Sequence, residues 1–191
     1  MRIIRVEHGG TSYYGILEDG LVFRLHQQPG HMEPIPLSEA KVLPLVTPSK
    51  VVCVGLNYKA HAEELGYPLP NMPSFFLKPP SSIIGNGEPI VLPSGMGRIE
   101  HEAELAMVVG KVCRNLTPEE AEESLFGFTC ANDVTAREVQ KVDPLIGHCK
   151  SYDTFCPIGP WIETELEDIN DLSIRCLVNG EVRQSANTGD M

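Results

Sequence analysis

The chain has 191 residues and carries 15 Lys and Arg side chains against 26 Asp and Glu, so its formal charge at pH 7 is −11. Hydrophobic residues make up 42% of the sequence and charged residues 21%, which excludes a disordered, collagen-like or coiled-coil chain. The acidic balance argues against nucleic acid binding, which needs a basic face, and against docking on anionic membranes.

The six cysteines are not spaced as zinc ligands or as a CxxC redox pair. The first residues, MRIIRVEHGG, lack the apolar core of a signal peptide, and no apolar run approaches the roughly 18 residues of a membrane span. We therefore expect a cytoplasmic protein with free thiols and no membrane partner.

The N-terminal residues alternate between apolar and polar side chains, with Asp19-Gly20 between two of the apolar runs. Asp-Gly in that position is a strong hairpin signal, so a small β-meander is predicted up to about His26. A proline-rich connection follows. We expect a small N-terminal β domain with this connection over residues 1–49 and a larger catalytic domain over residues 50–191.

Short apolar runs in the larger domain predict strands, the first of them buried, at Val51–Val54, Phe75–Leu77, Ile83–Ile84, Glu102–Val109 and Phe128–Ala131. The end of the fourth run, Leu105–Val109, also has the composition of a buried strand. A helix is predicted over Asn57–Leu65, with Gly66 as its stop signal.

Thr117-Pro118-Glu119-Glu120 is a capping box and predicts a helix from Pro118 to about Leu125. Thr135-Ala136-Arg137-Glu138 is a second capping-box candidate that predicts the start of a short helix, and Asn179-Gly180 predicts a type I′ hairpin. Many short strands and few helices together predict a β-rich α+β fold.

Glu102 and Glu104 lie two residues apart on a predicted strand, so their carboxylates point to the same face. Adjacent carboxylates repel unless a cation or a proton holds them, and Mg²⁺ prefers oxygen ligands of this kind. Asp133 follows another predicted strand, a position that presents a ligand well. The plainer interpretations are a solvated strand face for the glutamates and a turn or capping role for Asp133.

His61 and Glu64 form an i,i+3 pair on the predicted helix. A carboxylate beside an imidazole raises its pKa and orients it, which suits a general base, although an exposed ion pair is the plainer interpretation. Lys150 is a candidate for binding a carboxylate or an oxyanion, and a surface charge is its default interpretation.

Together these segments resemble the fumarylacetoacetate hydrolase family over residues 51–191. The resemblance rests on segments in family order: Gly55-Leu56-Asn57-Tyr58 with His61 and Glu64, Phe76-Leu77-Lys78-Pro79, Glu102-Ala103-Glu104-Leu105, Asn132-Asp133-Val134-Thr135-Ala136-Arg137 with Gln140, and Lys150–Pro160. The opening meander is similar to the small N-terminal domain of the bacterial branch of acylpyruvate hydrolases, oxaloacetate decarboxylases and isomerases.

The resemblance implies a mixed β-roll, usually in homodimers, that acts on a 2-oxo acid. It implies Mg²⁺ or Mn²⁺ held by Glu102, Glu104 and Asp133. It implies that His61 and Glu64 form a water-activating dyad on a lid and that Lys150 stabilises developing negative charge. Residues near the substrate would be Arg137, Gln140 and Lys78, of which the first two could instead support the metal ligands.

We predict hydrolysis of a C–C bond in acylpyruvates or related 2,4-dioxo acids, because the His61 and Glu64 pair is intact. This hydrolysis would release an enolate of the 2-oxo acid. The same enolate would form in a 2-oxo acid (oxaloacetate) decarboxylase or a 2-hydroxyhepta-2,4-diene-1,7-dioate isomerase, so both stay alternatives. The alternative outside the enzymes is a non-catalytic metal-stabilised domain or an inactive fragment. Family members continue past Met191 into further strands and a Gly-Thr-Pro turn, so we expect a C-terminal part to be missing.

Overall fold

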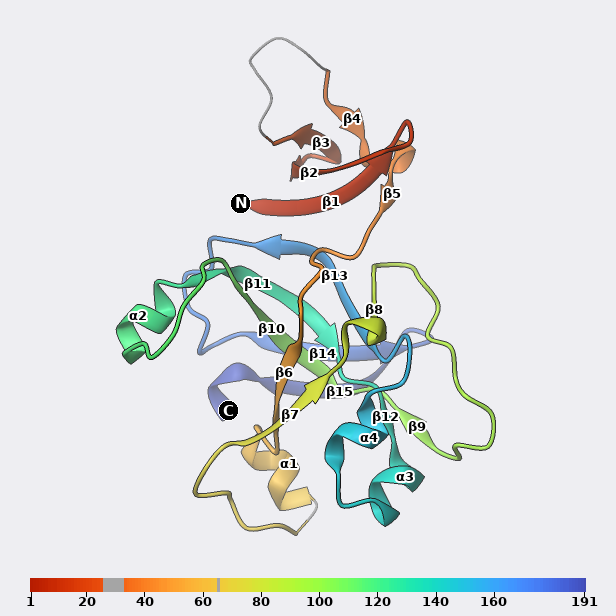
Figure 1. Ribbon diagram of the computed structural model, residues 1–191, viewed down its shortest axis with the longest axis vertical. Coiled ribbons are helices and arrows are strands. Elements are labelled where there is room, and N and C mark those ends of the chain that lie inside the picture. The colour runs from red at the N-terminus through yellow and green to blue at the C-terminus, as the bar shows by residue number, and fades with distance from the viewer. Residues whose placement is uncertain (26–32, 65) are drawn as a thin grey trace.

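The computed structural model describes residues 1–25, 33–64 and 66–191 (Figure 1). The predicted meander is confirmed: it consists of β1 (Arg2–His8), β2 (Thr11–Glu18) and β3 (Leu21–Arg24), paired antiparallel in chain order. Asp19 and Gly20 have φ angles of 48° and 78°, the left-handed conformation that a two-residue hairpin turn requires. The predicted end points at His26 and Leu65 lie outside the described residues.

The meander is part of a larger sheet, because β1 also pairs with β13 (Cys156–Glu163) far along the chain. The sheet has the order β10-β11-β13-β1-β2-β3-β4; beside it, β5 pairs with β1 and β8 pairs with β13. The remaining members of this sheet are β4 (Ile35–Pro36), β5 (Lys41–Val42), β8 (Ile83–Ile84), β10 (Ala103–Val109) and β11 (Leu125–Asn132). The division of domains at residues 49 and 50 stays a prediction.

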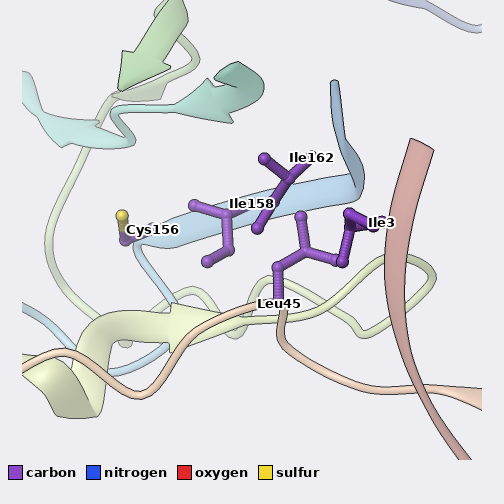
Figure 2. Packing of buried hydrophobic residues seen from close by; sticks show 5 residues of the cluster. All are labelled: Ile3, Leu45, Cys156, Ile158 and Ile162. Atoms are coloured by element: carbon purple, nitrogen blue, oxygen red, sulfur yellow. The ribbon is translucent and has the colours of Figure 1, made fainter. Parts of the chain in front are cut away.

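A cluster of buried apolar side chains packs β1 onto β13 (Figure 2); it consists of Ile3, Leu45, Cys156, Ile158 and Ile162. Leu45 comes from the proline-rich connection, which therefore lies against the core. A second cluster within the meander contains Ile4, Val6, Val22 and Ile35. The hydrophobic core thus runs from the meander into the main sheet.

The antiparallel pair β10 and β11 carries the predicted metal ligands, and α2 (Pro118–Glu122) lies between the two strands in sequence. The predicted capping box is confirmed, since the Glu120 backbone N–H donates to the Thr117 hydroxyl and the Glu120 carboxylate accepts from the Thr117 backbone N–H. The helix ends three residues earlier than predicted because β11 already begins at Leu125.

Figure 1 shows several short elements below the β10–β11 pair, on the side where the chain continues from β11 into β12. They form a β6–β7 ribbon, a β9–β12 pair and three helices: β6 (Val51–Gly55), β7 (Ser74–Lys78), β9 (Ile99–Glu100), β12 (Thr135–Ala136), α1 (Lys59–Glu64), α3 (Arg137–Val142) and α4 (Ile146–Lys150). The predicted Asn179-Gly180 hairpin is confirmed between β14 (Ser173–Val178) and β15 (Glu181–Asn187). The described part of the chain also contains the 3₁₀ turns η1 (Leu37–Glu39), η2 (Pro80–Ser82) and η3 (Thr188–Asp190).

The predicted β-rich α+β fold is confirmed, and the parallel pairing of β8 with β13 makes the main sheet mixed. Two local predictions were wrong. The short helix predicted at Thr135-Ala136-Arg137-Glu138 is present as α3, but Thr135 does not cap it, because α3 begins after Ala136 without a side-chain cap. Thr135 lies in β12, and its hydroxyl donates to the Asp133 carbonyl oxygen at 2.9 Å. Strand β6 is not buried on both faces, because Val52 is 55% exposed.

Strand β10 likewise buries only one of its faces, since Met107 and Val109 are exposed. A continuous apolar run is typical of a strand covered on both sides, so composition alone overestimated the burial of β6 and β10. Among the described residues, no helix combines the length and the hydropathy that crossing a bilayer requires.

Candidate metal and 2-oxo acid site

The three predicted metal ligands lie on one face of the β10–β11 pair. Glu104 is the cross-strand partner of Ala131, and the Asp133 backbone N–H donates to the Glu102 carbonyl oxygen at 2.8 Å. Glu102 is therefore opposite Asp133, and the two-residue period of a strand brings Glu104 to the same face. The interpretation of these glutamates as a solvated strand face does not hold, because Asp133 is buried and Glu102 and Glu104 are largely covered.

Lys150, at the end of α4, joins two of these carboxylates. Its Nζ lies 2.7 Å from Glu102 Oε2, 2.5 Å from Asp133 Oδ2 and 2.8 Å from Thr135 Oγ1, so each of its three N–H donors has an acceptor. Lys150 is buried, which rules out the default interpretation of a surface charge. Burial alone would lower its pKa, but the charges of Asp133 and Glu102 and their hydrogen bonds outweigh burial and raise it.

Lys78, at the end of β7, holds Asp133 from the other side. Its side chain is only 1% exposed, and its Nζ donates to Asp133 Oδ1 at 2.5 Å and to the Val134 carbonyl oxygen at 3.4 Å. Asp133 thus lies between two ammonium groups, one on each carboxylate oxygen. The predicted contact of Lys78 with substrate stays a prediction, and the contact it makes here is with a candidate metal ligand.

Arg137, the first residue of α3, orients Glu102. The guanidinium forms an ion pair with Glu102 Oε1 at 2.7 Å, donates to Glu100 Oε2 at 2.6 Å and donates to Gln140 Oε1 at 2.9 Å. Burial raises the pKa of Glu102, but the ion pairs and hydrogen bonds with Lys150 and Arg137 outweigh it, so the net shift is downward. Of the two roles expected for Arg137 and Gln140, this geometry fits support of the metal ligands.

Glu104 differs from its two neighbours, because in the part of the chain that the structure describes its carboxylate has no hydrogen bond to another side chain. Burial, together with the negative charges of Glu102 and Asp133, raises the pKa of Glu104 to about 8. The three carboxylates therefore share one face while only two of them are neutralised by nearby cations.

The predicted dyad of His61 and Glu64 lies on α1, with Nδ1 of the imidazole 3.5 Å from Glu64 Oε2. The two side chains are 37% and 78% exposed. Within residues 1–25, 33–64 and 66–191, no hydrogen bond or ion pair links them to the carboxylates of Glu102, Glu104 or Asp133. The structure therefore brings the predicted pair together without joining it to the buried cluster.

The donor chemistry of the carboxylates fits a hard divalent cation such as Mg²⁺ or Mn²⁺. Three carboxylates on one face supply oxygen ligands, and among the described residues Glu104 is the one of the three without a cationic side-chain partner. Across the described residues, no three His, Cys, Asp or Glu side chains already stand at metal-binding spacing. The carboxylate cluster thus fits a divalent cation in its donor atoms and its charge. In this structure Lys150 binds Glu102 and Asp133, and Lys78 binds Asp133.

Sequence reasoning missed two residues of this site: Glu100, which binds Arg137, and Thr135, which binds Lys150. A signal existed for Glu100, since it lies two residues before Glu102 just as Glu104 lies two residues after it. Thr135 was interpreted as a helix cap. Their contacts depend on which elements meet in space, which spacing along the chain does not reveal.

The chain belongs to the fumarylacetoacetate hydrolase family. Residues 50–191 match the family described as "Fumarylacetoacetate (FAA) hydrolase C-terminal", and residues 1–44 match "Rv2993c-like, N-terminal". An uncharacterised protein of Archaeoglobus fulgidus is 45% identical over 157 residues, which cover 82% of this chain and 62% of that protein. The mitochondrial oxaloacetate tautomerase FAHD2A of Homo sapiens is 43% identical over 164 residues, which cover 82% and 52%. The chain thus spans about half to two thirds of these relatives.

Solved structures of similar fold cover the whole chain. The 5-carboxymethyl-2-hydroxymuconate delta-isomerase of Mycobacterium smegmatis is 39% identical with a TM-score of 0.88, and the match covers 76% of it. The maleylpyruvate hydrolase of Sphingobium sp. SYK-6, in complex with manganese (II) ion and pyruvate, is 30% identical with a TM-score of 0.78 and is covered to 78%. The relatives named here as enzymes are thus a tautomerase, an isomerase and a hydrolase.

Proposed function

We propose that this chain belongs to an enzyme that uses Mg²⁺ or Mn²⁺ to interconvert the keto and enol forms of a 2-oxo acid. The observation that carries this proposal is the buried ammonium of Lys150, bonded to both Glu102 and Asp133. An enolising site needs positive charge where the ketone oxygen becomes negative, and Lys150 would supply a protonated ammonium beside the carboxylates that would hold the cation. The 43% identity to an oxaloacetate tautomerase supports the same chemistry.

Glu102, Glu104 and Asp133 would hold the cation. When bound, the cation supplies Lewis-acid polarisation of the substrate's ketone and carboxylate oxygens. Manganese and pyruvate in the solved maleylpyruvate hydrolase support a divalent metal and a 2-oxo acid as a pair of ligands. Whether the cation is Mg²⁺ or Mn²⁺ in this chain stays a prediction.

Lys150 stays protonated at neutral pH because its carboxylate partners raise its pKa. It therefore stabilises negative charge and does not remove protons. His61 is the candidate base: with Nδ1 turned to Glu64, its other ring nitrogen is available to take the proton from the carbon next to the ketone. The C–H electrons then form the C=C bond, and the proton held by the His61 imidazolium passes to the ketone oxygen, directly or through water, which gives the enol and returns His61 to its neutral form.

Hydrolysis of a C–C bond in an acylpyruvate is the second candidate, and it is favoured by the His61 and Glu64 pair. In that reaction His61 would take a proton from water, Glu64 would stabilise the imidazolium and Lys150 the oxyanion, and pyruvate enolate would leave. The likeness to a maleylpyruvate hydrolase supports this outcome. Loss of CO₂ from oxaloacetate would proceed through the same enolate.

The test compares the three outcomes with the 191-residue chain, in Mg²⁺ and in EDTA. Ultraviolet absorbance follows the enol of oxaloacetate, and coupled assays follow pyruvate released from oxaloacetate and from acetylpyruvate. We expect cation-dependent loss of the enol signal, abolished by Lys150→Met and retained by Lys141→Met, which changes an exposed lysine. Cation-dependent pyruvate release from acetylpyruvate that vanishes in His61→Ala would instead assign hydrolysis. Enol conversion that is equally fast in EDTA would contradict the proposal.

A further inference from the structure

The side-chain amide of Gln184, on β15, binds the backbone of the strand that carries Glu102 and Glu104. Its Oε1 accepts from the Ala103 backbone N–H at 2.8 Å, and its Nε2 donates to the Ala103 carbonyl oxygen at 3.1 Å. Both hydrogen bonds are partly buried and join residues 81 positions apart in the sequence. Neither the proposed chemistry nor the carboxylate cluster described above uses Gln184.

Ala103 lies between Glu102 and Glu104 and turns its backbone toward the open edge of the sheet. Strand β10 stands at one end of the sheet order, and its neighbour in the sheet is β11. Glu102 faces β11, since its carbonyl oxygen accepts from the Asp133 N–H at 2.8 Å and its own N–H donates to Asn132 Oδ1 at 3.0 Å. Backbone groups of successive residues point to opposite edges of a strand, so those of Ala103 point away from β11, toward the hairpin that packs there.

The Gln184 amide does at this edge what a further strand would do. A primary amide has a carbonyl acceptor and N–H donors, the same groups that the backbone of a neighbouring strand presents. Strands β14 and β15 form a separate two-stranded sheet, so the link to Ala103 is made by this side chain. The link falls on the residue between the two candidate metal ligands of β10.

Strand β15 is irregular next to Gln184. Cys176 pairs with Gln184 and Leu177 pairs with Val182, so Arg183 is an extra residue on the β15 side of the ladder. A bulge of this kind redirects nearby side chains and is often found beside functional sites. The bulge is therefore where the hairpin changes the direction of its side chains, directly beside the one that reaches Ala103.

The base of the hairpin is held by contacts that do not involve β10. Thr188 is buried, its hydroxyl accepts from the Leu172 backbone N–H at 2.8 Å, and its N–H donates to the Leu172 carbonyl oxygen at 2.9 Å. Gln184 thus extends from a hairpin that is anchored independently, and it can act as a fixed support for the strand that it binds.

The two glutamates of β10 depend on this support to different degrees. Glu102 is also oriented by its ion pairs with Lys150 and Arg137. Glu104 has no such side-chain partner in the described residues, so the position of its carboxylate follows the course of the strand. Two carboxylates on one strand share a face only where the strand keeps its extended, pleated conformation.

We propose that Gln184 is a positioning residue of the metal site: by fixing the Ala103 backbone, it holds the Glu102 and Glu104 carboxylates on one face, at the spacing that one divalent cation requires. This inference rests on the proposed metal site. Groups that orient metal ligands typically contribute 10- to 100-fold to metal affinity.

The test is titration of Mn²⁺, followed by electron paramagnetic resonance, into the wild-type chain and Gln184→Met, which keeps the side-chain length and removes both hydrogen bonds. We expect Mn²⁺ affinity to fall about ten-fold and the Ala103 amide to exchange faster in EDTA. Gln184→Asn keeps an amide but is one methylene shorter, so it should show the same loss. Circular dichroism in EDTA checks that each variant is folded.

Asn187→Leu is the matched control on the same strand. The Asn187 side chain also makes two hydrogen bonds, donating to Asp171 Oδ1 at 2.9 Å and accepting from the Gly189 N–H at 2.7 Å. Losing them should lower the Tm about as much as Gln184→Met does, because two hydrogen bonds are lost in each variant. Mn²⁺ affinity and Ala103 exchange should stay at the wild-type values in this control.

Two results would overturn the role of Gln184 and leave the proposed function standing. One is an unchanged Mn²⁺ affinity in Gln184→Met or Gln184→Asn. The other is an equal loss of affinity in Asn187→Leu, which would assign the effect to a general weakening of the hairpin. No Mn²⁺ binding by the wild-type chain would instead overturn the metal site and this inference together.

Discussion

The buried carboxylate cluster and the His61–Glu64 pair are built in opposite ways. In the cluster, each donor of Lys150 has an acceptor within 2.8 Å, and the ammonium group is buried. In the pair, two exposed side chains stand 3.5 Å apart on a six-residue helix. In the proposed mechanism, the positive charge of Lys150 is held in place before the reaction, whereas the proposed base, His61, lies on a short helix open to solvent.

The largest expected effect on folding is that of Lys150→Met. Removing one partner from a buried ion pair leaves an uncompensated charge, so the free energy of unfolding should fall by about 3–5 kcal/mol. Urea unfolding monitored by circular dichroism measures this change. Lys141→Met breaks only the exposed pair with Glu138 and should cost at most about 0.5 kcal/mol. Equal losses of unfolding free energy in the two variants would show that the ion pairs of Lys150 stabilise the fold no more than a surface ion pair does.

An intermediate effect is expected from Glu104. Because its folded pKa, about 8, lies above the ordinary value of 4.5, its contribution to stability is present below pH 4.5 and is lost as the pH rises through 8. In EDTA the free energy of unfolding should decline between pH 5 and pH 8 by on the order of 1–3 kcal/mol. Glu104→Gln should flatten this decline. A profile unchanged by the substitution would assign the pH dependence to other groups.

The smallest effect on folding is expected for His61→Ala, although its effect on turnover should be large. The exposed pair with Glu64 contributes about 0.5 kcal/mol at most to the free energy of unfolding. Loss of a general base should lower kcat by roughly 10²- to 10⁴-fold. Steady-state assays and urea unfolding on one preparation separate the two quantities. If His61→Ala were strongly destabilised and kept a normal kcat, the His61–Glu64 pair would serve folding and not catalysis, which would contradict the difference drawn between this pair and the buried cluster.

Local signals predicted much of the fold, because each depends on residues adjacent in sequence. The Asp19-Gly20 and Asn179-Gly180 hairpins and the Thr117 capping box are present as predicted. The failures concern tertiary context: Thr135 joins a strand and binds Lys150, where its own sequence favours a helix cap. One-sided burial of β6 and β10 likewise depends on what packs against each face.

Several residues named from the sequence lie together in the structure, while their roles stay predictions and most of their contacts could not be predicted. Glu102 and Glu104 share a face because a strand alternates, which the sequence already indicates. The lysines that meet Asp133 come from 55 and 17 positions away, so no spacing rule connects them. Lys78 was expected to contact substrate; its burial against Asp133 depends on how β7 packs beside that residue, which the sequence does not reveal.

The most direct measurement is electron paramagnetic resonance of Mn²⁺ added to the 191-residue chain in the presence of oxalate, which resembles the enolate of a 2-oxo acid. The buried carboxylate cluster should bind one Mn²⁺ per chain, so that the signal of free Mn²⁺ disappears up to one equivalent. The same titration of Asp133→Asn should leave that signal largely in place. A free Mn²⁺ signal that rises from the first addition in the wild-type chain would contradict a metal site at Glu102, Glu104 and Asp133.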